Sequence, residues 1–305
     1  MADNYNFSKE ELNAVRASAL RGDAESQNFL GMIYFGGVNV PKDQVRAFEL
    51  FMQAAEQGHA AAALNVADCY ENGEGVKRDY AEAFKWYQKA ADLGSAEAQS
   101  SVGCFYEFGH VVERDMDKAA KYYKQAADSG SISGAYHFAR YARSIGEQHV
   151  AFKYFAQAAQ GGIADAAYEV ARYFENGWGV GKDEIKALEW YGKAVAGGNM
   201  EAQYTLGNRY FEGDGIEQDL VLATKLFAAA AQQGHMQASI NLGKCLDAGV
   251  DFEKLIAEEA DEQARAKAEA EAEAVQEADP ASGAIPGCSS GILFRKEYEE
   301  THKEN

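Results

Sequence analysis

The chain is poor in several of the residues that mark other classes of protein. Its 305 residues include only three prolines, four cysteines and 29 lysines and arginines, against 48 aspartates and glutamates, for a formal net charge of −19. A nucleic-acid-binding surface needs clustered basic side chains, and an anionic membrane surface repels a negative protein. We therefore expect neither nucleic acid nor a membrane as a partner.

Long apolar runs and a leader segment are also missing. No stretch approaches the roughly 18 apolar residues of a membrane-spanning helix. Residues 1–6 have neither a basic start nor an apolar stretch, so no secretory signal is expected. The cysteines, Cys69, Cys104, Cys245 and Cys288, are too scattered for a disulfide framework. Reduced thiols and a cytoplasmic location are the expectation.

What the chain does contain is an internal repeat and, at 47% hydrophobic residues, enough apolar side chain for a sizeable core. Near-identical segments follow one another at a spacing of 36 residues, interrupted by one spacing of 32. A fixed period of this length predicts a solenoid of supersecondary units. The segments open at Gly22, Gly58, Gly94, Gly130, Gly162, Gly198 and Gly234.

The first half of each repeat predicts a helix, which we call helix A. An apolar residue is followed by Gly or Ala and, three residues further on, usually by an aromatic residue. These offsets lie on one helical face, and the small residue allows a neighbouring helix to approach closely. The small column is Gly31, Ala67, Gly103, Ala139, Ala171, Gly207 and Gly243, and the aromatic column is Tyr34, Tyr70, Tyr106, Phe174 and Tyr210.

A glycine loop and a second helix, helix B, follow. Loops such as Asn72–Val76 contain Asn and Gly, which tolerate the positive φ that ends a helix. An aspartate suited to capping helix B comes next. Helix B then pairs a column of alanines with a column of large residues three and four positions later, as interdigitating helices require. The capping column is Asp43, Asp79, Asp115, Asp183 and Asp219.

No segment with period-two alternation interrupts these helices, so the expected fold is all-α. The pattern is most complete from Gly58 to Ala91, where it resembles the Sel1-like repeat proteins, relatives of the tetratricopeptide repeats. Six full repeats and the first helix of a seventh match. The resemblance implies a right-handed superhelical α-solenoid of antiparallel helix pairs. It also implies a protein–protein interaction scaffold that holds a protein or peptide in a concave groove lined by helix A.

The repeat divides the chain into four expected parts. Residues 1–21 form an N-terminal capping helix that begins at the capping box Ser8–Glu11. Residues 22–252 form the solenoid, residues 253–279 an acidic Ala/Glu-rich helix, and residues 280–305 a flexible tail. In the tail, Gly291–Lys296 is either a short binding motif or an incidental apolar cluster. Repeat four lacks the glycine loop, so the superhelix is expected to kink there.

The candidate partner-binding residues are non-consensus positions of helix A in repeats four to six. Tyrosines and arginines four residues apart share a helical face, and both types are enriched at binding hot spots. The alternative is that the tyrosines pack between repeats and the arginines pair with local acids such as Asp165 and Glu175. The candidates are Tyr136, Arg140, Arg143, Tyr168, Arg172, Tyr204 and Asn208.

Trp178 is a further candidate, because other repeats place Glu, His or Asp in that loop column. The large aromatic side chain either docks on its own helix A or contacts a partner.

Catalytic motifs are not apparent. The Gly-rich loops recur with every repeat and none has P-loop spacing. The histidines make no metal-ligand spacing with any cysteine, so neither a metal nor a cofactor is expected. We therefore expect no enzymatic activity. Two alternatives remain, a β-lactam hydrolase, as suggested for cysteine-rich relatives that carry paired cysteines missing here, and a structural assembly subunit.

Overall fold

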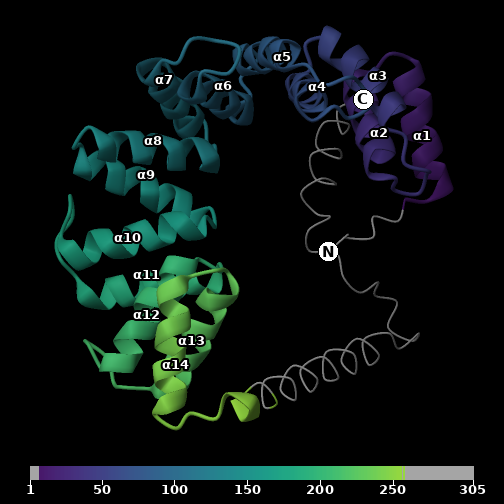
Figure 1. Cartoon of the computed structure of the whole chain (residues 1–305). Helices are drawn as coiled ribbons and strands as arrows, with labels where there is room; N and C mark the ends of the chain where they lie inside the picture. The colour runs from purple at the N-terminus through teal and green to yellow at the C-terminus, as the bar shows by residue number, and fades with distance from the viewer. Residues whose placement is uncertain (1–6, 256, 258–305) are drawn as a thin grey trace, which may run out of the picture. The chain divides into compact units, whose positions relative to one another are not determined.

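The computed structural model of the chain describes residues 7–255 and 257, and these residues contain fourteen α-helices and no strand (Figure 1). The all-α prediction is therefore confirmed. The helices are α1 (Lys9–Leu20), α2 (Ala24–Gly36), α3 (Gln44–Glu56), α4 (Ala60–Asn72), α5 (Tyr80–Asp92), α6 (Ala96–Phe108), α7 (Met116–Asp128), α8 (Ile132–Ser144), α9 (Gln148–Gln160), α10 (Ala164–Asn176), α11 (Glu184–Ala196), α12 (Met200–Glu212), α13 (Leu220–Gln232) and α14 (Met236–Asp247).

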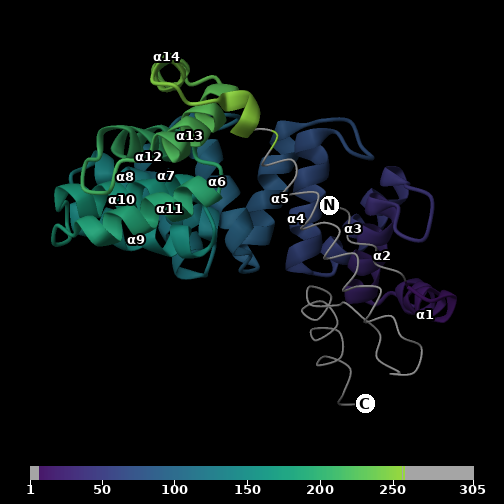
Figure 2. The same cartoon turned by 90° about the horizontal axis from the view of Figure 1, so that it is seen from below.

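The chain divides into two compact units, residues 1–239 and residues 240–305. In the first unit, every helix from α1 to α12 packs on the next helix in the sequence, and α12 packs on α13 (Figures 1 and 2). The even-numbered helices from α2 to α12 are helix A of repeats one to six, and the odd-numbered helices from α3 to α13 are helix B. In the second unit, α14 ends at Asp247, Gly249 in the following turn has a φ of 95°, and Asp251 caps a short helical segment through the backbone N–H of Lys254.

The predicted small column is where helix A and helix B of one repeat meet. A Cβ atom added to Gly31 would lie 2.5 Å from Cε1 of Phe51, and one added to Gly103 would lie 2.6 Å from Cε1 of Tyr123. The close approach inferred from the sequence is therefore confirmed. The buried core consists of two clusters, one between Leu12 and Phe105 and the other between Ala127 and Ala202.

The loops and helix caps form as the sequence predicts. Ser8 forms the expected capping box with Glu11 at the start of α1. The paired loop glycines, for example Gly73 and Gly75, have positive φ angles of 77° and 72°. Each of the five predicted aspartates caps the helix B that follows it, as Asp79 does by accepting hydrogen bonds from the backbone of α5.

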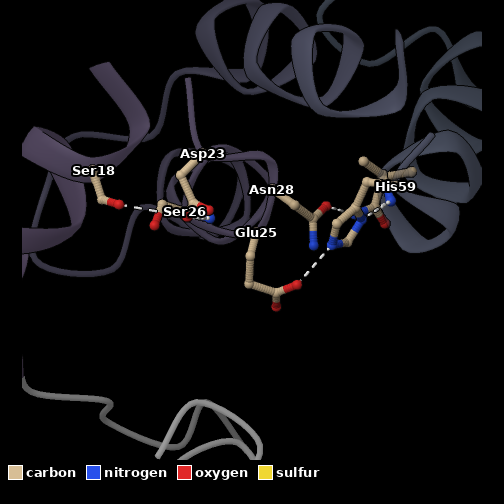
Figure 3. A network of polar contacts seen from close by, with 8 residues as sticks. Ser18, Asp23, Glu25, Ser26, Asn28 and His59 are labelled. Atoms are coloured by element: carbon tan, nitrogen blue, oxygen red, sulfur yellow. Dashed lines mark hydrogen bonds and ion pairs between the residues drawn. The ribbon is translucent and has the colours of Figure 1, made fainter. Parts of the chain in front are cut away.

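Polar caps also link one helix A to the next. His59 precedes α4, and its Nδ1 accepts a hydrogen bond from the backbone N–H of Ala62 at 3.1 Å. Its Nε2 lies 2.8 Å from a carboxylate oxygen of Glu25 on α2 (Figure 3). Asn199 makes the same pair of contacts, to Ala202 and to Asp165 on α10. His59 therefore serves as a helix cap that ties neighbouring repeats together, in line with its place in a recurring column.

Repeat four turns as predicted, without a glycine loop. Helix α8 ends at Ser144, Gly146 takes a φ of 85°, and α9 begins at Gln148. The kink expected from this shorter linker stays a prediction. The acidic helix, apart from its first residues, and the tail with its Gly291–Lys296 motif lie outside the described residues.

Candidate functional site

The three tyrosines of the predicted ladder contribute to packing within their own repeats. Each is half-buried on helix A and places its ring against an aromatic ring of helix B, at centroid distances of 5.8 to 6.2 Å. Burial is the main reason why the pKa values of Tyr136 and Tyr168 are raised. Their rings therefore support the surface on which the arginines lie. The pairs are Tyr136–Phe155, Tyr168–Tyr191 and Tyr204–Phe227.

Two of the predicted arginines converge on one carboxylate. Arg143 of α8 lies 2.5 Å from Oε1 of Glu169 on α10, and Arg172 lies 3.5 Å from Oε2 of the same residue. The Glu169 side chain is 14% exposed, whereas both arginine side chains are 36% exposed. Because two positive groups share one negative group, this cluster carries a net charge of +1 in an otherwise acidic protein.

Trp178 completes this cluster from the loop after α10. Its ring stands edge-on to the fully buried ring of Tyr173 at 5.7 Å, so the tryptophan docks on its own helix A. It stays 38% exposed, and the guanidinium of Arg172 lies 5.3 Å from its ring centroid. The loop is held in place by His149 of α9, whose Nδ1 lies 3.0 Å from the carbonyl oxygen of Gly179.

A pocket of 310 Å³ opens between these side chains, and we call it the arginine pocket. Within the described part of the chain, Oε1 of Gln148, Oε2 of Glu169 and the hydroxyl of Tyr173 are buried without a hydrogen bond, and all three lie in or beside this pocket. The pocket therefore combines arginine donors with buried oxygen atoms that lack a hydrogen bond. Its lining residues are Arg143, Gln148, Glu169, Arg172 and Trp178.

The remaining ladder residues do not line this pocket. Arg140 is exposed, with its guanidinium 6.0 Å from the ring of Tyr136, and Asn208 is half-buried on α12. The structure also corrects the expected acid partners. Glu169 pairs with the ladder arginines, whereas Glu175 pairs with Arg209, which the sequence interpretation overlooked.

Arg209 is a structural ion-pair centre. Its side chain is 9% exposed and lies 2.5 Å from Glu175 and 3.2 Å from Glu184, which belong to α10 and α11 of the preceding repeat. It therefore bridges repeats five and six. Its neighbour Asn208 occupies the ladder column and stays a predicted binding residue.

A second pattern on helix A was visible in the sequence but was not recognised. In repeats two, three and five, helix B carries a buried tyrosine and helix A a glutamate 16 residues earlier, and the tyrosine hydroxyl donates a hydrogen bond to the glutamate. Where helix B carries phenylalanine in repeats one and six, the helix A position is phenylalanine as well. The pairs are Glu71–Tyr87, Glu107–Tyr123, Glu175–Tyr191, Phe35–Phe51 and Phe211–Phe227.

The described residues give little support to catalytic chemistry. Burial, reinforced by Glu74 and Asp68, raises the pKa of Cys69 to about 12. Burial also raises the pKa of Cys104, so the reactive thiolate is disfavoured at both positions. Among residues 7–255 and 257, no three His, Cys, Asp or Glu side chains are grouped to hold a metal ion. None of the described helices is long and apolar enough to cross a membrane.

Comparison with known proteins identifies the class to which this fold belongs. The model of the Sel1 repeat matches residues 24–59, 60–95, 96–131, 147–163, 164–199 and 201–235, which is more than half of the chain. The chain therefore belongs to the Sel1 repeat family. In repeat four only the second half matches, in agreement with the missing loop. A search of the curated proteins found none that matches this sequence.

Two solved structures are similar over most of the chain. One is a protective antigen present in uropathogenic Escherichia coli strains, with 32% identity and a TM-score of 0.68 over 78% of this chain. This chain spans about half of that antigen, 52% of its length. The other is a Sel1 repeat protein from Oxalobacter formigenes, with 27% identity and a TM-score of 0.64, covering 72% of this chain and 90% of that one. Folds of this class are generally protein–protein interaction scaffolds and typically not enzymes.

Proposed function

We propose that this protein is a non-catalytic adaptor that binds a protein or peptide partner on the helix A surface of repeats four to six, in the groove expected for this fold. The observation that carries the proposal is the arginine pocket. Two predicted arginines and the predicted tryptophan meet there around Glu169. Arg and Trp are the side chains most enriched at binding hot spots.

The chemistry of the pocket favours a partner with an acidic residue. Arg172 lies 3.5 Å from Glu169, an ion pair at the limit of hydrogen-bond distance, and rests on the rings of Tyr168 and Trp178. Its planar guanidinium can therefore receive a carboxylate in two parallel hydrogen bonds. The exposed face of Trp178 offers apolar contact beside it. Because the cluster has a net charge of +1, an incoming carboxylate would neutralise it.

A regulatory role in the cytoplasm is part of this proposal. The described cysteines Cys69, Cys104 and Cys245 are free thiols, which is typical of a reducing compartment. The raised pKa values of Cys69 and Cys104 argue against the alternative of nucleophilic hydrolysis.

The test is capture of partners from native lysate by the full chain and by the double variant Arg172→Gln/Trp178→Ala. We expect the double variant to lose at least tenfold in affinity for the captured partner, because it loses both the carboxylate donor and the aromatic contact. Tyr168 is left intact, since its ring packs on Tyr191 and its truncation would disturb the fold.

Arg46→Gln is the matched control. Arg46 is also an exposed arginine on an aromatic ring, 4.6 Å from Tyr34, but it lies on α3 in repeat one. Its substitution should leave capture unchanged. Equal recovery of the same partners by the wild type and the double variant would contradict the proposal.

A further inference from the structure

The junction between repeats three and four differs from the other junctions of the first unit. Elsewhere the sequence places a large side chain on helix B and the consensus aromatic residue on the next helix A, 22 residues later. Three of these pairs are edge-to-face aromatic contacts, and the fourth combines Leu188 with Tyr210. The aromatic pairs are Phe48–Tyr70 at 5.3 Å, Phe84–Tyr106 at 5.9 Å and Phe152–Phe174 at 5.2 Å.

At the junction of repeats three and four, both positions are alanine. Ala120 of α7 and Ala142 of α8 are buried and have the same 22-residue spacing. Within repeat four, the N–H of Glu147 donates to the carbonyl of Ala142 at 2.9 Å, and in repeat three the N–H of Asp115 donates to Tyr106 at 2.9 Å, so helix B is joined to the same column of helix A in both repeats. The two large side chains of the other junctions are absent here.

A pocket of 420 Å³ lies at this junction, and we call it the junction pocket. Its walls include Ala142 itself together with Phe138, Tyr141 and Ile145 of the same repeat. The tyrosine ring is held in position, because the hydroxyl of Tyr141 donates to Asp117 of α7 at 3.0 Å.

The place of the pocket corresponds to that of the aromatic ring in repeat three. There, the ring of Tyr106 is stacked on Tyr122 at 5.9 Å, and the ammonium of Lys118 lies 5.4 Å from it. The same columns of helix B in repeat four hold Tyr154 and Val150, and both line the junction pocket. The pocket is thus the space left open where the consensus ring of this column is missing, beside the ring of Phe138, which lies edge-to-face on Tyr154 at 4.8 Å.

Two lysines, Lys124 and Lys153, line the pocket together with one acidic residue, Glu147. Asp128 and Asp117 lie beside the lining, because they accept hydrogen bonds from the hydroxyl groups of Tyr154 and Tyr141. Lys124 is paired with Asp128 at 2.6 Å. For Lys153, which lies 4.9 Å from the ring of Tyr154, the described residues show no ion pair. An acidic group beside a bound ring would therefore meet the exposed ammonium of Lys153.

We propose that the junction pocket binds an aromatic side chain of a protein partner, carried in a segment with acidic residues on either side of the ring. Aromatic side chains gain most from burial in an apolar seat with edge-to-face neighbours, and the neighbouring junctions show that this seat accepts such a ring. The junction pocket shares no lining residue with the arginine pocket, so it is a second, independent site.

The test uses the full chain with labelled isoleucine and valine methyl groups and the pentapeptide acetyl-Asp-Glu-Phe-Glu-Asp-amide as the probe. Ring currents should shift the methyl resonances of Ile145 and Val150 in a saturable way. A peptide with alanine in place of phenylalanine should bind at least tenfold more weakly. A peptide with lysines in place of the acids should bind severalfold more weakly at low salt, and the difference should shrink as salt is added.

Substitutions in the lining of the junction pocket test whether the probe peptide binds there. Ala142→Tyr restores the consensus ring, so it should abolish the saturable shifts and raise the melting temperature. Ala142→Ser is the matched control, which keeps the pocket open and should keep the shifts. Ile145→Glu places a charge at the exposed edge of the pocket and tests the site if Ala142→Tyr does not fold.

Three results would overturn the proposal. The first is equal binding of the phenylalanine and alanine peptides. The second is unchanged binding by the folded Ala142→Tyr variant, or by Ile145→Glu. The third is a concentration-dependent shift of the same methyl groups without any peptide, which would identify a second copy of this chain as the occupant.

Discussion

Replacing Gly75 by alanine should lower the free energy of unfolding by about 3 kcal/mol, the sum of a backbone cost and a packing cost. Gly75 has a φ of 72°, a conformation that costs an L-residue roughly 1–2 kcal/mol. Its added Cβ would also lie 2.0 Å from the backbone carbonyl oxygen of Gln44, at the start of helix B in the preceding repeat. Overpacking of this kind costs about 1–3 kcal/mol.

Gly58→Ala is the matched control for this prediction. Gly58 has a φ of 89°, but no atom lies within 4 Å of the position that its Cβ would take. It should therefore incur only the backbone cost of roughly 1–2 kcal/mol. Urea denaturation followed by helical circular dichroism measures both variants. Equal losses would show that the loop does not rest on the preceding repeat.

The neighbouring repeats support the left-handed conformation at this loop position. Asn39 and Val111 occupy the same column in repeats one and three, with φ angles of 57° and 65°. A β-branched residue rarely adopts such a φ. The fold therefore imposes this turn even where glycine is missing, and we expect the backbone cost at Gly75 not to relax away.

Removing the hydroxyl of Tyr123 should destabilise the fold by about 2 kcal/mol, because a charge-assisted hydrogen bond to a largely buried carboxylate is lost. Tyr123 is 1% exposed, and its hydroxyl donates to Glu107 at 2.6 Å. The Glu107 side chain is only 15% exposed. In the Tyr123→Phe variant, the Glu107 carboxylate stays largely buried but loses the hydrogen bond from the Tyr123 hydroxyl.

Two other repeats of the chain indicate which second substitution should restore stability to the Tyr123→Phe variant. Repeats one and six place phenylalanine at both positions of this pair, with the rings in contact at 6.4 and 6.3 Å. The double variant Glu107→Phe/Tyr123→Phe copies that arrangement and removes the carboxylate that has lost its hydrogen-bond donor. It should therefore be more stable than Tyr123→Phe alone, as measured by urea denaturation. A double variant whose loss equals or exceeds the sum of the two single losses would contradict the coupling.

The fold could be predicted from the sequence because the repeat shows each structural position several times. The period located the helix pairs, the small column located their contact, and the aspartates located the start of helix B in five of the six repeats. All of these depend on local geometry or on columns that recur. The shortened repeat four was also visible, since Ser144–Gly146 replaces the glycine loop.

The candidate site could be predicted from the sequence only in part. The sequence singled out Arg143, Arg172 and Trp178, but not Glu169, which brings the arginines together. A helix spacing shows which residues share a face, whereas the choice among nearby carboxylates depends on the side-chain directions of adjacent repeats. Arg140 fits the same spacing and yet stands apart from the pocket, because it is exposed beside its own tyrosine.

Two further features could have been found from columns alone. The glutamate–tyrosine pairs covary at a fixed spacing of 16 residues, and the junction alanines break a pattern of large side chains at a spacing of 22. Both appear only when positions on different helices are compared across repeats. Their structural meaning follows from the contacts, which show a hydrogen bond in one case and a pocket in the other.

Hydrogen exchange of the full chain, with and without a partner enriched from lysate, tests the proposed function most directly. We predict slower amide exchange in α8, in α10 and in the loop that carries Trp178, and no such slowing in the Arg172→Gln/Trp178→Ala variant. Slower exchange confined to the helix B elements α11 and α13, with α8 and α10 unchanged, would contradict the assignment of the arginine pocket as the partner site.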